Sequence, residues 1–178
     1  LVVAISTTLG ARNGLLVRNR RGLEEARNLN AVFFDKTGTL TRGEFRVVEI
    51  TTRAGMTDDE ALALAAAVER DSEHTIAQGI VKSAEEQAVN VPKADQFEAI
   101  PGHGVKAVVE GKEFYIGGPA MLKRLAVRPS PAVRDAAERA AARGQASIYL
   151  LTSKAAVAAF TIADAVRPES REAVRRLH

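Results

Sequence analysis

The chain of 178 residues contains no cysteine and no tryptophan, and aromatic residues make up only 4% of it. The absence of cysteine excludes disulfide bonds and thiolate metal sites, and it fits a protein of a reducing compartment. With so few aromatics, the core must be built from Ala, Val, Leu and Ile. Hydrophobic residues are plentiful at 46% of the chain, which excludes a disordered protein.

Long apolar runs are also missing. A membrane-spanning helix needs about 18 consecutive apolar residues, and no run in the chain approaches that length. The apolar residues 1–5 are too short a run for a signal peptide and follow no charged segment. Because the first residue is not Met, we expect the chain to be part of a longer protein.

The charge pattern does not favour a nucleic-acid partner. The formal net charge is +3, and the basic residues gather near the two ends of the chain. A stripe that binds nucleic acid is normally longer and carries aromatics or a binding motif, whereas short charge runs are usually solvated faces.

Periodicity and turn residues predict a chain of alternating short strands and helices. Thr57 and Glu60 have the spacing of a capping box, Ser72 is expected to cap the next helix, and Gly144 suits a position just after a helix end. The predicted strands are 14–17, 31–35, 45–52, 96–100, 104–112, 113–118, 146–152 and 155–163. A helical end is predicted at the start of the chain, and the other predicted helices are 22–29, 57–70, 72–91, 131–143 and 167–177.

These elements predict a nested organisation within an α/β fold. The apolar strand that ends at Asp35 suits a parallel sheet, whereas the middle of the chain reads as a separate antiparallel sheet with helices. An inserted domain needs its two ends close together in space. We therefore expect three segments, namely residues 1–44, the inserted domain 45–162, and the returning segment 163–178.

Asp35 is the first candidate for chemistry. Ligands of open α/β sheets bind at the carboxyl ends of strands, where this carboxylate is expected. Gly38 lets the backbone approach an anion closely, and the amides after Asp35 can form an anion-binding nest. A carboxylate in such a place can attack phosphorus and form an aspartyl phosphate, although a lone Asp more often caps a turn.

Residues 35–41, DKTGTLT, resemble the phosphorylation motif of P-type ATPases, the ATP-driven ion pumps, and match it completely. The resemblance implies that Asp35 takes the γ-phosphate of ATP, while Lys36 neutralises the phosphate and Thr39 holds the phosphoryl group. It also implies that Asp35 and the main-chain oxygen of Thr37 bind Mg²⁺.

A soluble phosphohydrolase of the same aspartate-nucleophile superfamily is the main alternative. Related hydrolases carry a second Asp two residues after the nucleophile as a general acid and base, and here that position is Thr37. Threonine does not transfer protons at neutral pH, so a phosphoenzyme would be long-lived, which suits a pump. A non-catalytic nucleotide-binding module is a further alternative, but it leaves the motif without a purpose.

Residues 69–77, ERDSEHTIA, resemble the SEHP nucleotide-binding element of the heavy-metal-transporting P-type ATPases. The resemblance implies that His74 stacks on adenine and that Glu69 contacts the base. The alternative for His74 is a surface or capping role in the first turn of a helix. The family's Pro is replaced by Thr75, which does not fix φ as proline would.

Two later segments extend the resemblance. PGHGV at 101–105 is similar to a loop in which two glycines, here Gly102 and Gly104, let the backbone touch the nucleotide, whereas Gly118 replaces an Asn of the family. IADAVRPES at 162–170 resembles the hinge back into the phosphorylation domain. There Asp164 and Arg167 would approach the sugar and phosphates, although a salt-bridged helix start explains Arg167 equally well.

The resemblance covers nearly the whole chain and is closest to copper-exporting type IB pumps with a Cys-Pro-His membrane motif, with zinc, cadmium or cobalt pumps left open. It implies a partial Rossmann-like phosphorylation domain of the haloacid-dehalogenase type. An α+β nucleotide-binding domain, built on an antiparallel sheet flanked by helices, is inserted into it. The implied ligands are ATP and Mg²⁺, and the transported metal ion binds outside this chain.

The resemblance also implies a cytoplasmic part of an integral protein of the plasma (inner) membrane, with a membrane domain and an actuator domain as partners. Residues 1–44 would include the cytosolic end of a membrane helix. The chain lacks the family's TGD and GDGxND segments, which complete the Mg²⁺ site and steady the phosphate. We therefore expect it to bind nucleotide weakly and not to turn over ATP by itself.

Overall fold

The computed structural model describes residues 8, 10–12, 14, 16–17, 19–25 and 28–177. The chain divides into two compact units, Leu1–Asp35 (unit 1) and Lys36–His178 (unit 2). Each unit is described by itself.

Unit 1 contains the helix α2, Arg20–Glu25, which begins two residues before the predicted helix 22–29. The predicted strand 14–17 is wrong for its described residues, because Gly14 lies in a turn and residues 16 and 17 have no regular structure. The helical end predicted for the start of the chain lies largely outside the described residues.

The buried strand predicted for residues 31–35 is also wrong. These residues have no regular secondary structure, and their side chains are exposed, with Phe33 97% exposed. A strand is held by hydrogen bonds to a neighbouring strand. Within the described residues, every strand of the sheet pairs with others of unit 2, and none pairs with residues 31–35. The apolar run therefore has no partner here, and Asp35 is exposed.

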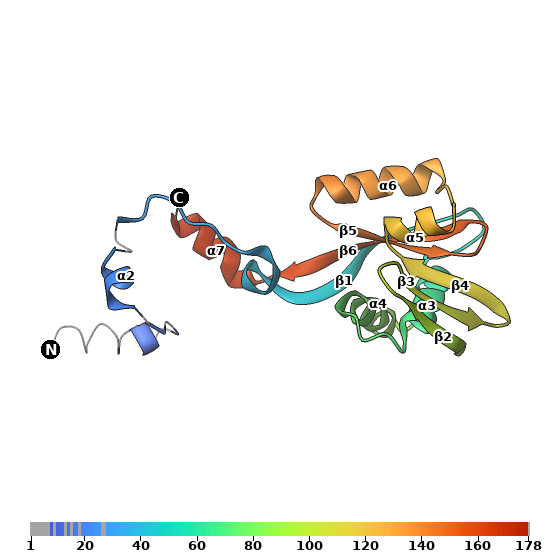
Figure 1. The fold of residues 1–178 in the computed structure, drawn as a ribbon, viewed down its shortest axis with the longest axis horizontal. Coiled ribbons are helices and arrows are strands. Elements are labelled where there is room, and N and C mark those ends of the chain that lie inside the picture. The colour runs from blue at the N-terminus through green and yellow to red at the C-terminus, as the bar shows by residue number, and fades with distance from the viewer. Residues whose placement is uncertain are drawn as a thin grey trace. The chain divides into compact units, whose positions relative to one another are not determined.

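Unit 2 is built on one six-stranded antiparallel sheet with the order β1-β6-β5-β4-β3-β2 (Figure 1). The antiparallel sheet predicted for the middle of the chain is confirmed, although β1 starts before the predicted strand 45–52. The strands are β1 Thr41–Thr52, β2 Ala94–Ile100, β3 Gly104–Val109, β4 Lys112–Gly117, β5 Ala146–Leu151 and β6 Ala156–Val166.

The first and last strands of this sheet are neighbours. β1 pairs with β6 in antiparallel register from Thr41 opposite Val166 to Thr52 opposite Ala158. The chain therefore enters and leaves the sheet side by side, as expected for an insertion. Both strands continue without a break through residues 44 and 162, where domain boundaries were predicted.

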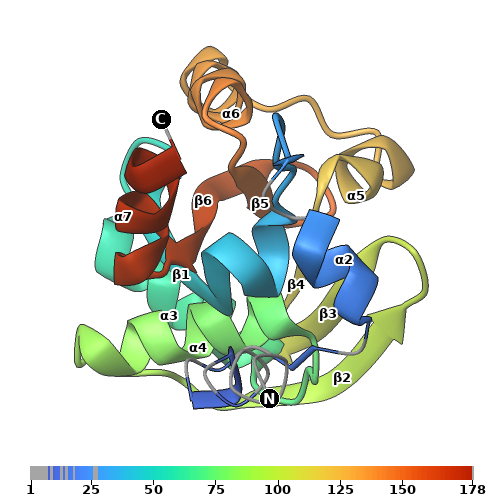
Figure 2. The same ribbon diagram turned by 90° about the vertical axis from the view of Figure 1, so that its left-hand side faces the viewer.

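Helices cover both faces of the sheet. Figure 1 and Figure 2 show α3 (Asp58–Glu69) and α4 (Thr75–Glu86) on one face, with α5 (Pro119–Arg124) and α6 (Pro131–Ala142) on the other. The last helix, α7 (Pro168–Leu177), follows β6. Helix α5 was not predicted, because six residues are too few for a helical period to show.

The first residues of α3 and α4 can be compared with the predicted helix caps. Thr57 and Glu60 form the predicted capping box at the start of α3, with each side chain bonded to the other residue's main-chain N–H. The prediction that Ser72 caps α4 is wrong. The cap is His74, whose Nδ1 accepts a hydrogen bond from the N–H of Ile76 at 3.2 Å.

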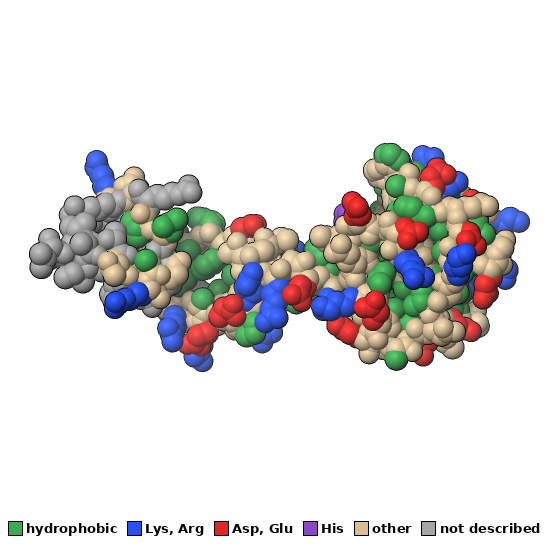
Figure 3. Space-filling view, turned by 90° about the horizontal axis from the view of Figure 1, so that it is seen from below, with side chains coloured by type: hydrophobic (Ala, Val, Ile, Leu, Met, Phe, Trp, Pro, Cys, Tyr) green, Lys and Arg blue, Asp and Glu red, His purple; other side chains and the backbone are tan. Residues whose placement is uncertain are grey.

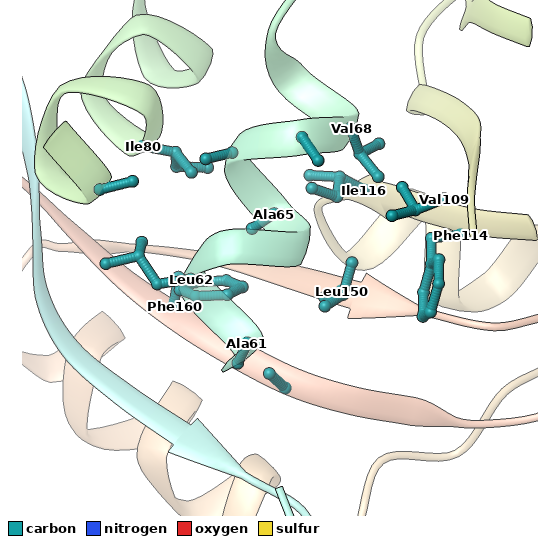
Figure 4. Packing of buried hydrophobic residues seen from close by; sticks show 14 of the residues in the cluster. Ala61, Leu62, Ala65, Val68, Ile80, Val109, Phe114, Ile116, Leu150 and Phe160 are labelled. Atoms are coloured by element: carbon teal, nitrogen blue, oxygen red, sulfur yellow. The ribbon is translucent and has the colours of Figure 1, made fainter. Parts of the chain in front are cut away.

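The core lies mainly between α3, α4 and the sheet, and aliphatic side chains dominate it (Figure 4). Leu62 and Val68 of α3 and Ile80 of α4 pack with Phe160 of β6 and Ile116 of β4, and all five are fully buried. A smaller cluster under α5 and α6 includes Met121, Val133 and Leu151. This composition agrees with a core of Ala, Val, Leu and Ile that has few aromatics.

No helix among the described residues is long and apolar enough to cross a membrane. On the face of unit 2 seen in Figure 3, positive and negative side chains are interspersed rather than gathered into one basic stripe.

Candidate functional site

A cavity of about 450 Å³ opens at one end of the sheet of unit 2. It brings together four predicted site residues from three segments: Glu69 at the end of α3, His74 before α4, and Gly102 and Gly104 from the turn between β2 and β3. The hydrophobic residues that line it are Ile76, Ala99, Ile100, Val105, Ile116 and Ile148. An apolar cavity with a few polar groups has the character of a small-molecule site.

Glu69 is an unusual carboxyl group because only 7% of the residue is exposed. Burial raises the pKa of Glu69 to about 7, and a hydrogen bond with Ser72 opposes this shift only in part. Near neutral pH the carboxyl group is therefore present in both protonation states. It can accept a hydrogen bond from an amine as the carboxylate, or donate one as the acid.

His74 is exposed and lies at the opening of the cavity. Its Nδ1 accepts the capping hydrogen bond from Ile76, so in this tautomer Nε2 carries the proton. The cap fixes one edge of the imidazole and leaves its faces available for stacking. Capping and ligand contact, which the sequence presented as alternatives, are therefore compatible.

The two glycines of the turn have different structural roles. Gly102 has φ +74°, and a Cβ built there would meet nothing within 4 Å, so its surroundings are open. Gly104 has φ +142°, and a Cβ there would lie 1.9 Å from the carbonyl oxygen of Ile116. Gly104 is thus required by the close pairing of β3 with β4, whereas Gly102 leaves room at the cavity.

The residues after Asp35 form a tight turn, Lys36–Leu40, that leads into β1. Gly38 at its centre has φ +80°, a conformation that glycine adopts without strain. The hydroxyl of Thr41 closes the turn: it accepts a hydrogen bond from the N–H of Gly38 at 3.2 Å and donates to the carbonyl of Lys36 or to Asp164. Thr41, the last residue of the motif, was not among the predicted site residues.

Asp164 and Arg167 contact this turn and do not line the cavity. Arg167 donates from Nε to the carbonyl of Thr41 at 3.0 Å and from Nη2 to the carbonyl of Gly38 at 3.3 Å. Asp164 accepts from the Thr41 hydroxyl through one oxygen, while Oδ1 is buried and has no hydrogen-bond partner within the described part of the chain. In this structure the two residues hold the turn in shape.

The four catalytic candidates lie at the boundary between the two units in the sequence. Asp35 belongs to unit 1, whereas Lys36, Thr37 and Thr39 belong to unit 2 and are exposed. Lys36 donates a hydrogen bond from Nζ to the carbonyl of Gly144 at 3.4 Å.

No three His, Asp or Glu side chains among the described residues are grouped as a metal site. Mg²⁺ in phosphate-transfer sites commonly takes one or two protein oxygens, with phosphate oxygens and waters for the rest. The motif at residues 35–41 offers oxygens of both kinds, a carboxylate and main-chain carbonyls.

The sequence is similar to known proteins over almost its whole length. Residues 29–178 match the haloacid dehalogenase-like hydrolase family. The chain is 40% identical over 177 residues to copper-exporting P-type ATPase B of Archaeoglobus fulgidus, an alignment that covers 99% of this chain and 25% of that relative. The chain thus spans about a quarter of the length of this curated relative.

Solved structures agree with the sequence comparison. The chain is similar to a zinc-transporting PIB-type ATPase in the E2.Pi state, with a TM-score of 0.81 and 29% identity over 98% of this chain and 28% of the other. It is also similar to the catalytic domain of the CPx-ATPase CopB-B, studied upon nucleotide binding, with a TM-score of 0.65 and 26% identity over 91% of this chain and 53% of the other.

Proposed function

Because the chain belongs to the haloacid dehalogenase-like hydrolase family and resembles the catalytic part of PIB-type ATPases over almost its whole length, we propose that it is the ATP-binding and phosphorylation part of a heavy-metal pump. The observation that carries the proposal is the cavity of unit 2. Four residues selected from sequence motifs, Glu69, His74, Gly102 and Gly104, line it together.

In the proposed reaction, a carboxylate oxygen of Asp35 attacks the γ-phosphorus of ATP. The bond between this phosphorus and the bridging oxygen to the β-phosphate breaks, ADP leaves with the electron pair, and an aspartyl phosphate forms on Asp35. Lys36 offsets negative charge on the phosphate, and Thr39 holds the phosphoryl group. Thr37 stands where a phosphatase carries its general acid, so this residue does not promote hydrolysis of the phosphoenzyme.

The nucleotide's base would lie in the cavity of unit 2. Glu69 contacts the exocyclic amine of adenine, the imidazole of His74 stacks on the ring, and the apolar floor excludes water from beneath it. Gly102 lets the backbone approach the base. When bound by Asp35 and Thr37 together with the phosphates, Mg²⁺ would supply charge neutralisation at the γ-phosphate.

We propose copper as the transported metal. The relative that is 40% identical is a copper exporter, and residues 1–20 resemble copper-exporting pumps. Zinc is the second candidate, since a structure with a TM-score of 0.81 is a zinc-transporting ATPase. In the intact protein, the metal sites would lie in a membrane domain, and this chain would face the cytoplasm beside an actuator domain. Stimulation of ATP hydrolysis by Cu⁺ or Zn²⁺ in the intact protein distinguishes these metals.

Nucleotide binding is testable in the chain itself. Titration calorimetry with ATP should show binding that His74→Ala weakens about tenfold, because stacking of a base on a ring contributes about 1–3 kcal/mol. Glu73→Gln, an exposed neighbour of His74 outside the cavity, is the control and should bind as the wild type does. Equal affinity of the wild type and His74→Ala would contradict the adenine site.

The phosphorylation step is tested in the intact pump. Incubation with γ-labelled ATP should give an acid-stable, hydroxylamine-sensitive phosphoenzyme that Asp35→Asn abolishes. Persistence of this species in Asp35→Asn would exclude Asp35 as the nucleophile.

A further inference from the structure

The start of α7 is bonded to the end of the turn Lys36–Leu40 by a residue that was not among the predicted site residues. Ser170 lies in the first turn of α7 and is buried, with 8% of the residue exposed. Its hydroxyl donates a hydrogen bond to the carbonyl of Leu40 at 2.9 Å. Because a buried hydroxyl without a partner is destabilising, this bond fixes the orientation of the Ser170 side chain.

The carbonyl of Leu40 accepts a second hydrogen bond from the same segment. The main-chain N–H of Arg167 donates to it at 2.9 Å. The N–H of Ser170 in turn donates to the carbonyl of Arg167 at 3.0 Å, which joins the two donors to each other. Leu40 is therefore bound to a closed helical turn rather than to one mobile side chain.

The side chain of Arg167 extends this contact along the turn. It donates to the carbonyls of Gly38 and Thr41, so three carbonyls within residues 38–41 accept hydrogen bonds from residues 167–170. In a planar trans peptide the N–H points opposite to the C=O. The N–H of Thr39, which shares a peptide plane with the Gly38 carbonyl, therefore points away from Arg167. Thr39 is exposed, which leaves it accessible to a phosphate group.

Ser170 is the most shielded side chain of this contact. The bond from Arg167 Nη2 to Gly38 is exposed, and 38% of the Arg167 side chain is accessible to water. Water can replace an exposed hydrogen bond at little cost, whereas it cannot readily replace a buried donor. We therefore expect the Ser170 hydroxyl to restrain the turn more strongly than the exposed bond does.

We propose that Ser170 is a positioning residue for phosphoryl transfer, an inference that rests on the proposed function. Its hydroxyl holds residues 36–41 against the start of α7, so the turn that carries Lys36, Thr37 and Thr39 keeps one shape when ATP arrives. Ser170 does not line the nucleotide cavity. Its loss should therefore slow transfer of the γ-phosphoryl group to Asp35 and leave ATP affinity unchanged.

Rapid-quench mixing of the intact pump with γ-labelled ATP separates these two effects. At saturating ATP, Ser170→Ala should form the phosphoenzyme about tenfold more slowly than the wild type, because small displacements of a catalytic segment cost rate steeply. The ATP concentration that gives half of the maximal rate should be the same in both proteins.

Conservative variants distinguish the hydroxyl from simple packing. Ser170→Thr keeps the hydroxyl and should restore the rate. Ser170→Cys keeps the size of the side chain but replaces the hydroxyl with a weak donor, so it should be as slow as Ser170→Ala. Arg171→Gln changes the exposed next residue of α7 and is the control, with the rate of the wild type.

The chain described here gives a readout that does not depend on activity. In Ser170→Ala, amide hydrogen exchange of residues 36–41 should be several-fold faster than in the wild type, because the turn opens more often. Exchange of residues 101–105 at the nucleotide cavity should not change. Thermal unfolding verifies that each variant is folded.

The outcomes separate this inference from the proposed function. A wild-type rate of phosphoenzyme formation in Ser170→Ala or Ser170→Cys, an equally slow Ser170→Thr, or unchanged exchange of residues 36–41 would overturn the role of the Ser170 hydroxyl. Each of these results would leave the proposed function intact. Absence of a phosphoenzyme in the wild-type pump would overturn both.

Discussion

At the scale of single residues, Gly102 and Gly104 show that two members of one motif have different physical tasks. Both have positive φ, but only Gly104 sits where a Cβ would collide with the neighbouring strand. The sequence predicted both as places where the backbone touches a nucleotide. It could not separate them, because the collision depends on the pairing of β3 with β4.

Alanine substitutions should separate these tasks. Gly104→Ala should prevent native pairing of β3 and β4 and lower the unfolding temperature strongly, since a Cβ 1.9 Å from a carbonyl oxygen forces the strands apart. Gly102→Ala should remain folded at a loss of about 1–2 kcal/mol for the left-handed backbone and should bind ATP more weakly.

Gly111→Ala is the matched control for Gly102→Ala, because Gly111 has the same φ of +74° and equally open surroundings outside the cavity. It should lose similar stability and keep its ATP affinity. Thermal unfolding followed by circular dichroism, with calorimetry of ATP binding, measures both effects. A Gly104→Ala protein as stable as the wild type would refute the steric role.

Glu69 should make the stability of the chain depend on pH. Its pKa is about 7 in the folded chain against 4.5 normally, so between these values the folded state binds more protons than the unfolded state. The free energy of unfolding should therefore fall as pH rises from about 4.5 to 7, by up to about 3 kcal/mol at 1.36 kcal/mol per pKa unit.

Urea unfolding at pH 5 and pH 8 measures this fall. Glu69→Gln should remove most of it, whereas Glu73→Gln, an exposed carboxyl nearby, should keep it. Equal pH dependence in the wild type and Glu69→Gln would show that Glu69 does not titrate as burial requires.

At the scale of elements, sequence patterns predicted most of unit 2 because its elements carry local signals. The capping box of α3, the proline and glycine that bound α6, and the alternation of the strands all act within a few residues. One failure had a non-local cause, because residues 31–35 have a strand's composition but no partner strand among the described residues. The other was local: the cap of α4 is His74, two residues after the predicted Ser72.

The candidate site was predictable to a similar extent. Motif residues indicated the cavity of unit 2, because Glu69, His74 and the glycine turn keep their spacing in the sequence. Ile148 of β5 carried no motif, and only folding brings it to this cavity. Thr41 was visible as a motif residue, but its contact with Asp164, 123 positions away, was not.

Gly79 lies where α4 packs against β1. At this position helix propensity and steric contact should change the free energy of unfolding in opposite directions when glycine is replaced by alanine. A Cβ on Gly79 would lie 2.6 Å from the carbonyl oxygen of Phe45, a main-chain atom of β1. Propensity alone predicts that Gly79→Ala stabilises α4 by about 1 kcal/mol. We expect sterics to dominate, with a net loss of about 1–3 kcal/mol.

Chemical denaturation measures the sign directly. Gln78→Ala, on the exposed side of the same helix, should change stability by less than about 0.5 kcal/mol. A Gly79→Ala protein more stable than the wild type would mean that α4 can move away from β1 without loss of packing.

At the scale of the whole molecule, nucleotide binding and phosphoryl transfer have different structural requirements. The binding cavity is formed within unit 2, whereas Asp35 is exposed on a segment without regular structure in unit 1. Catalysis needs the nucleophile held within a fraction of an ångström of its productive position. We therefore predict that this chain binds ATP but shows no steady-state hydrolysis.

A phosphate-release assay with Asp35→Asn as the blank checks this prediction. The rate of the wild-type chain should equal that of the blank. Sustained turnover above it would show that residues 31–35 reach a catalytic arrangement without further partner strands.

The antiparallel pair of β1 and β6 has a consequence for how such a chain can be rearranged. The two strands are hydrogen-bonded to each other over most of their length. The segment between them therefore begins and ends at neighbouring positions in the sheet. Residues 41–166 could be grafted into another host at a single surface loop, with little strain at the junction. The same geometry makes the reverse event, loss of the whole module with rejoining of the flanking chain, equally simple in evolution.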